Sequence, residues 1–531
     1  MTFSSWFVCL KICDVVDMMK KLYIVDLDYT LVDVDTTNEF IKMICPRRHY
    51  ILSKVLPFAM LLNKLLKTFD EIYILDLHGN SLKKETTPEG GKDENVFDIR
   101  QGVAIALFIK NKKNKDSKVF HLDKYGLREE KSEWLDNNEF NEKNYHEIKP
   151  ASPWYFFIPR NTLYIQKYLE WKRIDEIFPV NVTGIVTARD KFVIGFEKNE
   201  IKNRILQFRN LSLPDEIIKQ TYNLKDTRGW KISAARKKLS DDTDWDSYYE
   251  TILYRPFDAR TIYYTDKMVD WGRPEVMRHM LEENIGLMTC RQISSNNWRH
   301  ALVTENIVDD SLVSNKTKER GYIYPLYLYP DKNKRDLFNQ HQNEKEPNIP
   351  PALFDKLSSH YGQKPTPEDI LYYIYGIFYS NMYRETYAEF LKIDFPRVPF
   401  TADYTLFKKI GALGKELADL HLLKSPALDN PIAKYQGRGT NDRIEKIIYK
   451  EDEQRIYINK DKYFEGVAPE IWNYHIGGYQ VLRKYLKDRK GRNMDDAPRY
   501  CRIATALSKT IEIQKQIDEI YAEIEKDLVQ F

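Results

Sequence analysis

The stretch from Phe69 to Lys110 limits the possible folds most strongly, because two short apolar runs flank a long polar excursion. The runs Ile72–Leu77 and Val103–Ile109 have the length and composition of strands. The stretch between them contains glycines and is too hydrophilic to be buried. We therefore expect a strand, a long surface excursion and a second strand. Phe97 precedes the second strand, on a loop that can bring its ring to the edge of the sheet.

Ordered motifs recur along most of the chain. They are Asp76-Leu77-His78-Gly79-Asn80, Gly90-Gly91-Lys92, Val96–Ile105, Gly184–Asp190, Tyr254-Arg255-Pro256-Phe257-Asp258 and Trp472–Gln480. This order resembles type ISP and related type II restriction-modification proteins, in which an adenine-N6 DNA methyltransferase is followed by a target recognition domain. The resemblance covers roughly residues 67 to 531.

The resemblance implies a fold class, a partner and a role for Phe97. We expect an α/β and α+β multidomain chain, with a remnant of a Rossmann-like methyltransferase sheet followed by a mixed α+β target recognition domain. The partner would be double-stranded DNA, and Phe97 would stack against an extruded adenine, because an enzyme that modifies a base inside a duplex must flip it out. The expected parts are the end of the catalytic domain at 67–120, a connector and first recognition part at 121–335, and a helical and mixed recognition domain at 336–531.

Two motifs that the family uses for catalysis do not occur in this sequence. They are the loop that binds S-adenosylmethionine and the Asn-Pro-Pro-Tyr/Phe motif that grips the adenine amino group. The nearest string, Asn348-Ile349-Pro350-Pro351-Ala352, is interpreted as a loop leading into a helix. We expect a DNA-binding chain that does not methylate alone. The alternative is an active adenine methyltransferase completed by a separate methyltransferase or nuclease polypeptide.

The amino terminus carries a different resemblance. Residues 20–32 read as a strand that runs into an Asp-x-Asp-x-Thr motif, similar to the first motif of haloacid dehalogenase-like phosphatases. By that resemblance Asp26 would be the nucleophile, Asp28 the acid/base and Mg²⁺ the cofactor. The match ends near Lys67, before the family's further motifs, so we favour a strand that simply ends in acidic loop residues. We expect a possible leader at 1–18, a phosphatase-like fragment at 19–66, and a rearranged or truncated gene joined near residue 67.

Composition places few limits on function. The net charge is +3, so any attraction to nucleic acid must come from local patches. The five cysteines are scattered, without a Cys-x-x-Cys pair for zinc, which predicts a reducing cytoplasm and no metal site. The longest apolar stretch, Ile51–Leu66, is interrupted by lysines, which argues against a membrane span.

Candidate DNA contacts lie in three places. Arg189, in the Gly184–Asp190 motif, is either a phosphate or base contact or the partner of a neighbouring acid. A loop between two predicted strands carries side chains that can read base edges. A run of basic residues follows Tyr479, on a predicted helix that ends at Gly491, and its density favours phosphate contacts. The loop and the helix contribute Arg291, Gln292, Asn296, Asn297 and Arg299, and Arg483, Lys484, Lys487, Arg489, Lys490 and Arg492.

Other segments predict the framework around these candidates. Asn111–Ser132 is lysine-rich and is interpreted as a solvated connector. Pro367 follows Thr366 and predicts a helix start with Thr366 as the N-cap. Further strands and helices are predicted at Asn284–Thr289, Ala301–Thr304, Tyr322–Tyr329, Phe407–Leu423 and Leu507–Leu528.

Overall fold

The computed structural model describes residues 6–7, 58–81, 85–110, 117–160, 163–295, 297–316, 319–331 and 345–531. Its contacts divide the chain into two units, Met1–Thr162 and Leu163–Phe531. Both are mixed α and β structures, as we expected for the fold class. Among the described residues, none of the helices is long and apolar enough to cross a bilayer. The phosphatase-like residues Asp26 and Asp28, and Mg²⁺ binding by them, lie outside the described residues.

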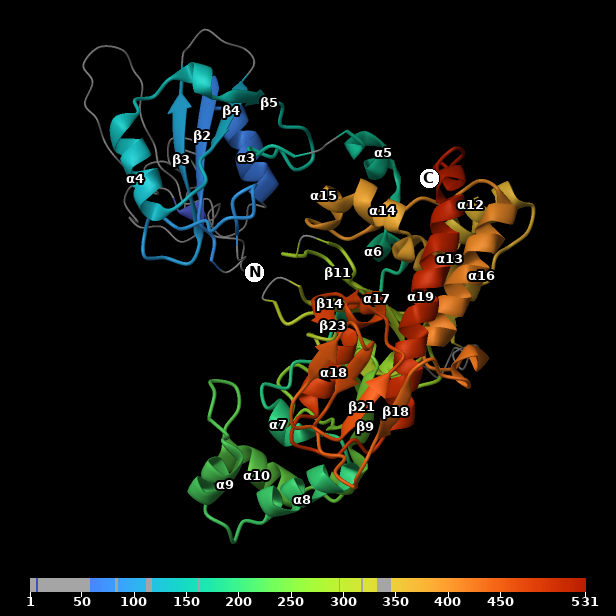
Figure 1. The fold of residues 1–531 in the computed structure, drawn as a ribbon. Coiled ribbons are helices and arrows are strands. Elements are labelled where there is room, and N and C mark those ends of the chain that lie inside the picture. Colours follow the sequence, from blue (N-terminus) through green and yellow to red (C-terminus); the bar gives the residue numbers. More distant parts are fainter. Residues whose placement is uncertain are drawn as a thin grey trace. The chain divides into compact units, whose positions relative to one another are not determined.

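The N-terminal unit is built on a mixed sheet (Figure 1), with strand order β1-β3-β2-β4-β5 among the described residues. Strands β2 and β3 are antiparallel and confirm the two strands predicted from the apolar runs. Strand β4 pairs with β2 in parallel and β5 pairs with β4 in antiparallel orientation. The elements are β1 (Trp6–Phe7), α3 (Phe58–Leu66), β2 (Glu71–His78), β3 (Gly102–Ile109), β4 (Lys118–Asp123), α4 (Arg128–Asn137) and β5 (His146–Ile148).

Helices cover both faces of this sheet. Leu62 and Leu65 of α3 pack with Ile74 and Phe108 in one apolar cluster. Trp134 and Leu135 of α4 pack against Leu75, Leu77 and Val103 in a second cluster. Burial on both faces explains why β2 and β3 read as nearly continuous apolar runs.

The solvated connector predicted over Asn111–Ser132 is wrong where the structure describes it. Lys118–Asp123 is strand β4, and helix α4 begins at Arg128. In β4 the buried residues are Val119 and the polar His121, and the two charged ends of the strand are exposed, so the segment does not read as an apolar run. The boundary predicted at residue 120 falls inside this strand, while the domain boundaries as a set stay a prediction.

Several small sheets form the first half of the C-terminal unit. The strand orders are β13-β9-β10-β8, β12-β11-β14-β7 and, in two short pairs, β15-β16 and β17-β6. The strands are β6 (Lys172–Arg173), β7 (Val182–Thr183), β8 (Ile194–Gly195), β9 (Tyr249–Arg255), β10 (Asp258–Tyr263), β11 (Gly286–Cys290), β12 (Ala301–Thr304), β13 (Ile307–Val308), β14 (Gly321–Pro325), β15 (Tyr327–Leu328), β16 (Glu346–Pro347) and β17 (Arg397–Val398). Strands β11 and β12 confirm two of the strands predicted in this region, whereas the single strand predicted over Tyr322–Tyr329 is divided into β14 and β15, which belong to different sheets.

Short helices connect and flank these sheets. They are α5 (Ile165–Glu170), α6 (Ile174–Ile177), α7 (Asp190–Val193), α8 (Lys198–Arg209), α9 (Asp215–Tyr222), α10 (Ile232–Ser240), α11 (Pro274–Met280), α12 (Pro351–Tyr361), α14 (Asn381–Thr386) and α15 (Ala388–Leu391). Helix α12 begins directly after Pro350, which confirms the interpretation of Asn348–Ala352 as a loop leading into a helix. The Asn348 side chain donates to the carbonyl oxygens of Val180 and Pro325, so it is used inside the fold.

Three long helices lie side by side in the second half of this unit (Figure 1): α13 (Pro367–Tyr379), α16 (Tyr404–His421) and α19 (Ala497–Ile524). Thr366 caps α13, because its hydroxyl accepts the Asp369 amide at 3.0 Å, as predicted. Helices α13 and α16 approach closely at Gly414, where a Cβ would lie 1.9 Å from the Tyr372 carbonyl oxygen. A side chain larger than hydrogen at this position would push the two helices apart.

A small sheet with strand order β18-β21-β20-β19 and a β22-β23 pair complete the unit. Their bounds, with the remaining helices, are β18 (Lys434–Gly437), β19 (Ile448–Lys450), β20 (Arg455–Tyr457), β21 (Lys462–Glu465), α17 (Pro469–Trp472), β22 (His475–Ile476), β23 (Tyr479–Gln480) and α18 (Val481–Asp488). Helix α18 ends at Asp488, before the end predicted at Gly491, and Gly491 has φ +86° in the turn that follows.

Candidate nucleic-acid interface

The loop that carries Phe97 presents an exposed aromatic ring from a fixed backbone. Phe97 is 39% exposed, although it is a large apolar side chain. Its amide donates to Asn95 Oδ1 at 2.8 Å, and Asn95 is buried. The Asn95 amide group also donates to the carbonyl oxygens of Gly79 and Gln101, which ties the loop to both ends of the excursion. The ring is therefore exposed on a loop whose base is ordered.

Two basic side chains of helix α4 also bind the loop that carries Phe97. Arg128 Nη2 donates to the Phe97 carbonyl oxygen at 3.0 Å, and its Nη1 donates to Asp98 at 2.7 Å. Lys131 is fully buried and donates to Asp93 Oδ1 at 2.7 Å and to the Glu94 carbonyl oxygen at 2.6 Å. A buried lysine is costly unless it is paired, so these bonds specify the loop position. The sequence offers no local sign of this role, because Asp93 lies far from Lys131 along the chain.

Gly79 explains why the loop can pack so closely against the end of β2. Its φ is +81°, and a Cβ at this position would lie 2.4 Å from the Asn95 Cα. Only glycine fits both the backbone angle and this approach. The Asp76–Asn80 motif thus contributes a packing contact beneath the Phe97 loop.

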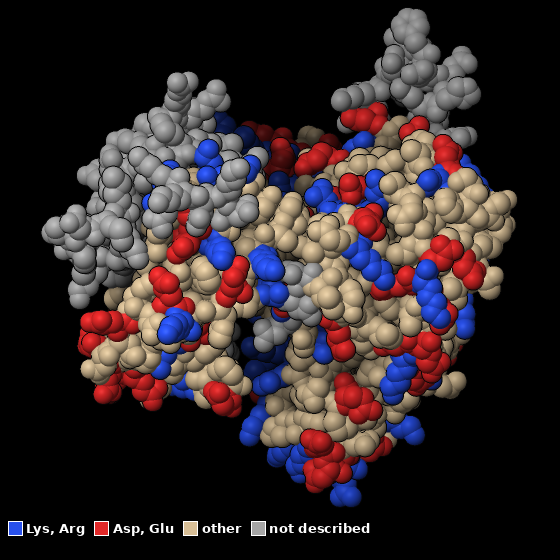
Figure 2. All heavy atoms as spheres, turned by 90° about the horizontal axis from the view of Figure 1, so that it is seen from above, with Lys and Arg blue, Asp and Glu red and all other residues tan. Residues whose placement is uncertain are grey.

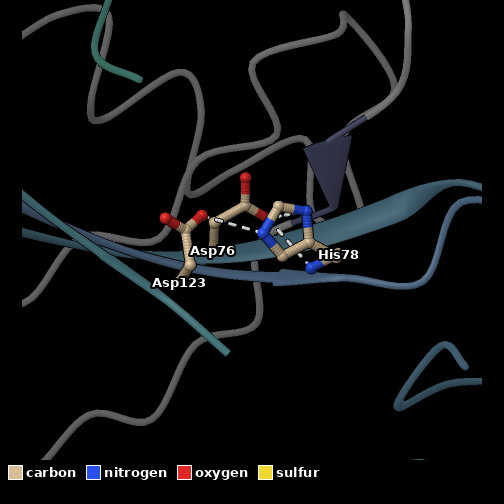
Figure 3. A group of neighbouring side chains, drawn as sticks. All are labelled: Asp76, His78 and Asp123. Atoms are coloured by element: carbon tan, nitrogen blue, oxygen red, sulfur yellow. Dashed lines mark hydrogen bonds and ion pairs between the residues drawn. The ribbon is translucent and has the colours of Figure 1, made fainter. Parts of the chain in front are cut away.

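A cluster of titratable side chains lies beside this motif. Figure 3 shows the His78 ring next to the Asp76 and Asp123 carboxylates. His78 Nε2 lies 2.8 Å from Asp123 Oδ1 and Nδ1 lies 3.3 Å from Glu85 Oε1, while Tyr125 stacks on the ring at 3.8 Å. Burial lowers the pKa of His78, but the bonds to Asp123 and Glu85 outweigh it and raise the pKa to about 9. Burial raises the pKa of Asp76 to about 7, against the opposing effect of His78.

These groups are close enough to bind a cation, yet they already satisfy one another. Potential ligand atoms of Asp76, His78 and Asp123 lie within 4.8 Å of one another. Both ring nitrogens face carboxylates, which favours an imidazolium held by acids. The absence of a metal, which the sequence predicts, stays a prediction.

Arg189 is buried in the C-terminal unit and has partners inside it. Its Nη2 donates to Asp270 Oδ1 at 2.6 Å and its Nη1 to the Met268 carbonyl oxygen at 2.6 Å. The guanidinium also lies 3.9 Å from the centre of the Trp230 ring. The partner acid is Asp270, whereas Asp190 accepts bonds from Thr187 and Tyr254. Of the two sequence interpretations, the geometry agrees with an internal ion pair, and a DNA contact stays a prediction.

The predicted base-reading loop is held from beneath by a buried carboxylate. Glu319 Oε1 accepts the amide of Ser294 at 2.7 Å and the amide of Ser295 at 2.9 Å, and both serine hydroxyls as well. Its other oxygen lies 3.0 Å from His300 Nε2. Although burial raises the pKa of Glu319, the bonds from His300, Ser314 and Ser294 hold it well below its usual range. Glu319 was not predicted from the sequence as part of this site.

The candidate side chains on this loop differ in exposure and partners. Asn297 is exposed, and Asn296 lies outside the described residues. Arg291 is exposed and donates to Asp394 at 3.1 Å. Gln292 donates to the Ile393 carbonyl oxygen. Base contacts by these side chains stay a prediction, and Arg291 and Asn297 are the exposed ones among those described.

The basic run Arg483–Arg492 begins on helix α18, continues past its end at Asp488, and divides into two sets. Arg483, Lys487 and Lys490 are exposed, and none forms an ion pair within the part of the chain that the structure describes. The other three basic side chains are used internally. Lys484 pairs with Asp488, Arg489 with Asp258 and Arg492 with Glu200.

Asp258 is the buried carboxylate that pairs with Arg489 of the second set. It is 1% exposed and accepts bonds from Arg260 and Arg489. The guanidiniums of Arg260, Arg489 and Arg492 also lie 4.3 to 4.8 Å from the centre of the Phe196 ring. Although burial raises the pKa of Asp258, the two paired arginines hold it below its usual range. The pairs Arg489–Asp258 and Arg260–Asp488 therefore join α18 to β10, and Arg492 reaches Glu200 of α8, whereas Arg483, Lys487 and Lys490 face solvent.

Charge of both signs is spread over the surface. On the face drawn in Figure 2, basic and acidic side chains are interspersed, in agreement with the net charge of +3. Any DNA contact must therefore depend on local geometry, as we expected from the composition.

Comparisons with known proteins agree with this fold. No curated protein matches the sequence. The structure of LlaBIII, described as an ATP-dependent Type ISP restriction-modification enzyme bound to DNA, is similar with a TM-score of 0.65 and 22% identity, over 87% of this chain and 32% of that one. The DrdV–DNA complex has a TM-score of 0.65 and 21% identity, over 86% of this chain and 49% of that one.

A third structure is a nuclease-deletion mutant of the Type ISP enzyme LlaGI in complex with a DNA substrate mimic. It has a TM-score of 0.60 and 20% identity, over 86% of this chain and 38% of that one. This chain thus spans between 32% and 49% of the length of these proteins. At these identities the likeness concerns the fold alone. The sequence profile described as "Type ISP C-terminal specificity domain" matches residues 176–516, most of the chain, and the chain therefore belongs to the Type ISP C-terminal specificity domain family.

Proposed function

We propose that this chain is the DNA-binding, sequence-recognition part of a restriction-modification adenine-N6 DNA methyltransferase. The observation that carries the proposal is the specificity-domain match over residues 176–516. The similar structures of LlaBIII and DrdV are DNA complexes, which supports duplex DNA as the partner. With DNA as its partner, the chain would work in the cytoplasm.

Within the C-terminal unit, phosphate binding and base reading fall to different side chains. The exposed cations Arg483, Lys487 and Lys490 suit phosphate contacts, which position a protein without specifying sequence. Asn297, on the loop held by Glu319, has the amide geometry that suits adenine. Arg189 is buried, and we assign it the structural role of holding the Gly184–Asp190 motif in place.

The N-terminal unit fits the end of a methyltransferase catalytic domain. Helices cover both faces of its sheet, as in a Rossmann-like domain, and Phe97 is exposed on a loop held by Arg128 and Lys131. We assign Phe97 the role of stacking against an extruded base. Since the Asn-Pro-Pro-Tyr/Phe motif and the S-adenosylmethionine loop do not occur in the sequence, the chain alone binds DNA without methylating it.

The test is a binding titration of the purified chain with labelled duplex DNA over a salt series, with radiolabelled S-adenosylmethionine present. We expect saturable binding that weakens as salt rises from about 50 to about 200 mM, because phosphate contacts release counterions. No methyl group should be incorporated. Absence of duplex binding would refute the proposal.

A second candidate is an active methyltransferase completed by another polypeptide. The ordered Phe97 loop favours it, since a base-stacking ring is useful only where a base is flipped. Methyl transfer that appears after a separate methyltransferase subunit is added, and is lost with Phe97→Ala, would establish this function. The phosphatase alternative is tested by phosphate release from a phosphomonoester, which Asp26→Asn would abolish.

A further inference from the structure

Trp271 is a large exposed aromatic side chain that the sequence motifs did not single out. It lies between β10 and α11 and is 49% exposed. Most exposed apolar residues on this unit are aliphatic or lie at element ends, and a single one needs no explanation. Trp271 differs because its backbone is fixed and its ring has two cationic neighbours.

The backbone around Trp271 is held on both sides. The Trp271 amide donates to the Val186 carbonyl oxygen at 3.0 Å, and the Val186 amide donates back at 3.1 Å. The Tyr264 hydroxyl donates to the Gly272 carbonyl oxygen at 2.6 Å. Arg273 then begins helix α11 from a left-handed backbone with φ +57°. Because these contacts already fix the backbone, binding through Trp271 would cost little conformational entropy.

Two guanidiniums approach the indole from different segments. The guanidinium carbon of Arg273 lies 5.1 Å from the ring centre and that of Arg320 lies 5.7 Å from it. Arg320 directly precedes β14, so it is far from Trp271 along the chain. We name Trp271, Arg273 and Arg320 the Trp271 patch.

The cations of the Trp271 patch are not neutralised by ion pairs among the residues that the structure describes. The buried Nε of Arg273 has no hydrogen-bond partner there. Burial raises the pKa of Asp310. The charge of nearby Arg320 lowers it, but this is the smaller effect. The patch therefore combines net positive charge with an exposed aromatic face.

We propose that the Trp271 patch is a DNA contact, at which Arg273 and Arg320 bind backbone phosphates and the indole packs on an adjoining sugar or unstacked base. The proposal rests on the proposed function and assigns it a second contact surface. Guanidinium groups bind phosphate oxygens in a fork, and aromatic faces pack on nucleotides of any sequence. An apolar protein partner would fit poorly, because it would bury two unpaired cations. The contact would add affinity without choosing sequence.

The experiment compares salt dependence of duplex binding for the wild-type chain and for Arg273→Gln with Arg320→Gln, using a labelled mixed-sequence duplex. Each lost phosphate contact should reduce the slope of log K against log salt by about 0.9, so the double variant should lose about 1.8. Arg273→Lys with Arg320→Lys keeps both charges and should retain the slope. Trp271→Ala should weaken binding at least about fivefold with the slope unchanged.

Matched controls use exposed residues outside the patch. Arg228→Gln with Arg438→Gln removes two exposed guanidiniums, and Leu211→Ala removes an apolar side chain that is 53% exposed. Thermal melting by circular dichroism, with Trp271→Phe as a milder variant, identifies any loss of folding. If the wild-type chain does not bind duplex DNA, the proposed function itself fails. If the wild-type chain binds and the patch variants bind like the controls, only the patch proposal is overturned. The patch proposal is likewise overturned if these variants keep DNA binding but lose association with a protein partner.

Discussion

The basic run of helix α18 and the Trp271 patch differ in how their cations are used. The run has six basic residues within Arg483–Arg492, and three of them are paired with Asp488, Asp258 and Glu200. The patch has only two, contributed by residues far apart in the chain, and both lack an acidic partner among the described residues. The density of charge in a sequence is therefore a poor measure of the charge available to a ligand.

The physical reason is that a basic side chain already paired with an internal carboxylate is not free to bind a phosphate. Arg489 beside Asp258 holds α18 against the rest of the unit, and a phosphate could recruit it only by leaving that buried carboxylate with Arg260 alone. Arg273 would lose no ion pair by turning to a phosphate. The first kind of cation should therefore contribute to stability and the second kind to binding.

Asp258→Asn should have the largest effect. It removes the negative charge between Arg260 and Arg489, which are largely buried, so Arg489 loses its acid and Arg260 keeps only its longer contact with Asp488. Breaking a buried pair in this way costs roughly 3–5 kcal/mol. Urea unfolding of the C-terminal unit, followed by circular dichroism, should show this loss. Asp452→Asn, at an exposed turn, is the matched control, and an equal effect of the two variants would contradict the pairing.

Two triple variants of α18 should separate binding from stability. Replacing the exposed set, Arg483, Lys487 and Lys490, by glutamine should lower the slope of log K against log salt by up to about 2.7, at about 0.9 for each phosphate contact, with little change in melting temperature.

Replacing the paired set, Lys484, Arg489 and Arg492, by glutamine should lower the melting temperature instead. At temperatures where this variant is folded, its salt slope should stay close to that of the wild type. The opposite pattern, with binding lost in the paired set alone, would show that these cations leave their internal acids to meet DNA.

The fall in unfolding free energy at low pH should depend on Asp258, with a smaller effect than the substitution at neutral pH. Its pKa is lowered in the folded chain, because Arg260 and Arg489 outweigh burial. The stability that it contributes is therefore present above its ordinary pKa of 3.8 and is lost as the pH falls through the lower folded value. In Asp258→Asn the decline of unfolding free energy on acidification should be shallower than in the wild type. An unchanged decline would mean that Asp258 does not titrate with the fold.

Tyr264→Phe should have the smallest effect. It removes the hydroxyl that donates to the Gly272 carbonyl oxygen beneath Trp271. A single hydrogen bond of this kind contributes about 1 kcal/mol, so DNA affinity should fall about fivefold at most, with the salt slope unchanged. Tyr248→Phe, on a neighbouring tyrosine that does not support Gly272, is the control. Equal affinity losses in both would show that the position of Trp271 does not matter.

Much of the local structure could be predicted from the sequence. The strands β2 and β3, the Thr366 cap of α13 and the helix after Pro350 were all predicted from patterns that lie within a few residues of each other. Apolar runs, N-caps and proline positions act over one turn or one strand, so a single sequence carries them.

The site could be predicted only in part, because its geometry depends on distant residues. The sequence around Lys131 is typical of an exposed polar helix, yet Lys131 is buried and paired with Asp93. Glu319 orders Ser294 and Ser295 from another segment. Trp271 is joined with Arg320 by the pairing of separate strands, which no local pattern reveals. For the same reason the six basic residues within Arg483–Arg492 could not be divided into exposed and paired sets before the fold was known.

The most direct test of the central claim is selection of duplexes from a random-sequence pool by the purified chain at moderate salt. A specificity domain should enrich one sequence motif, with each mismatched base pair costing about 1–3 kcal/mol in subsequent binding titrations. Base substitution within the motif should change affinity, and the exposed cations should set the salt dependence. Salt-sensitive binding without enrichment of any sequence would contradict the claim that this chain reads DNA sequence.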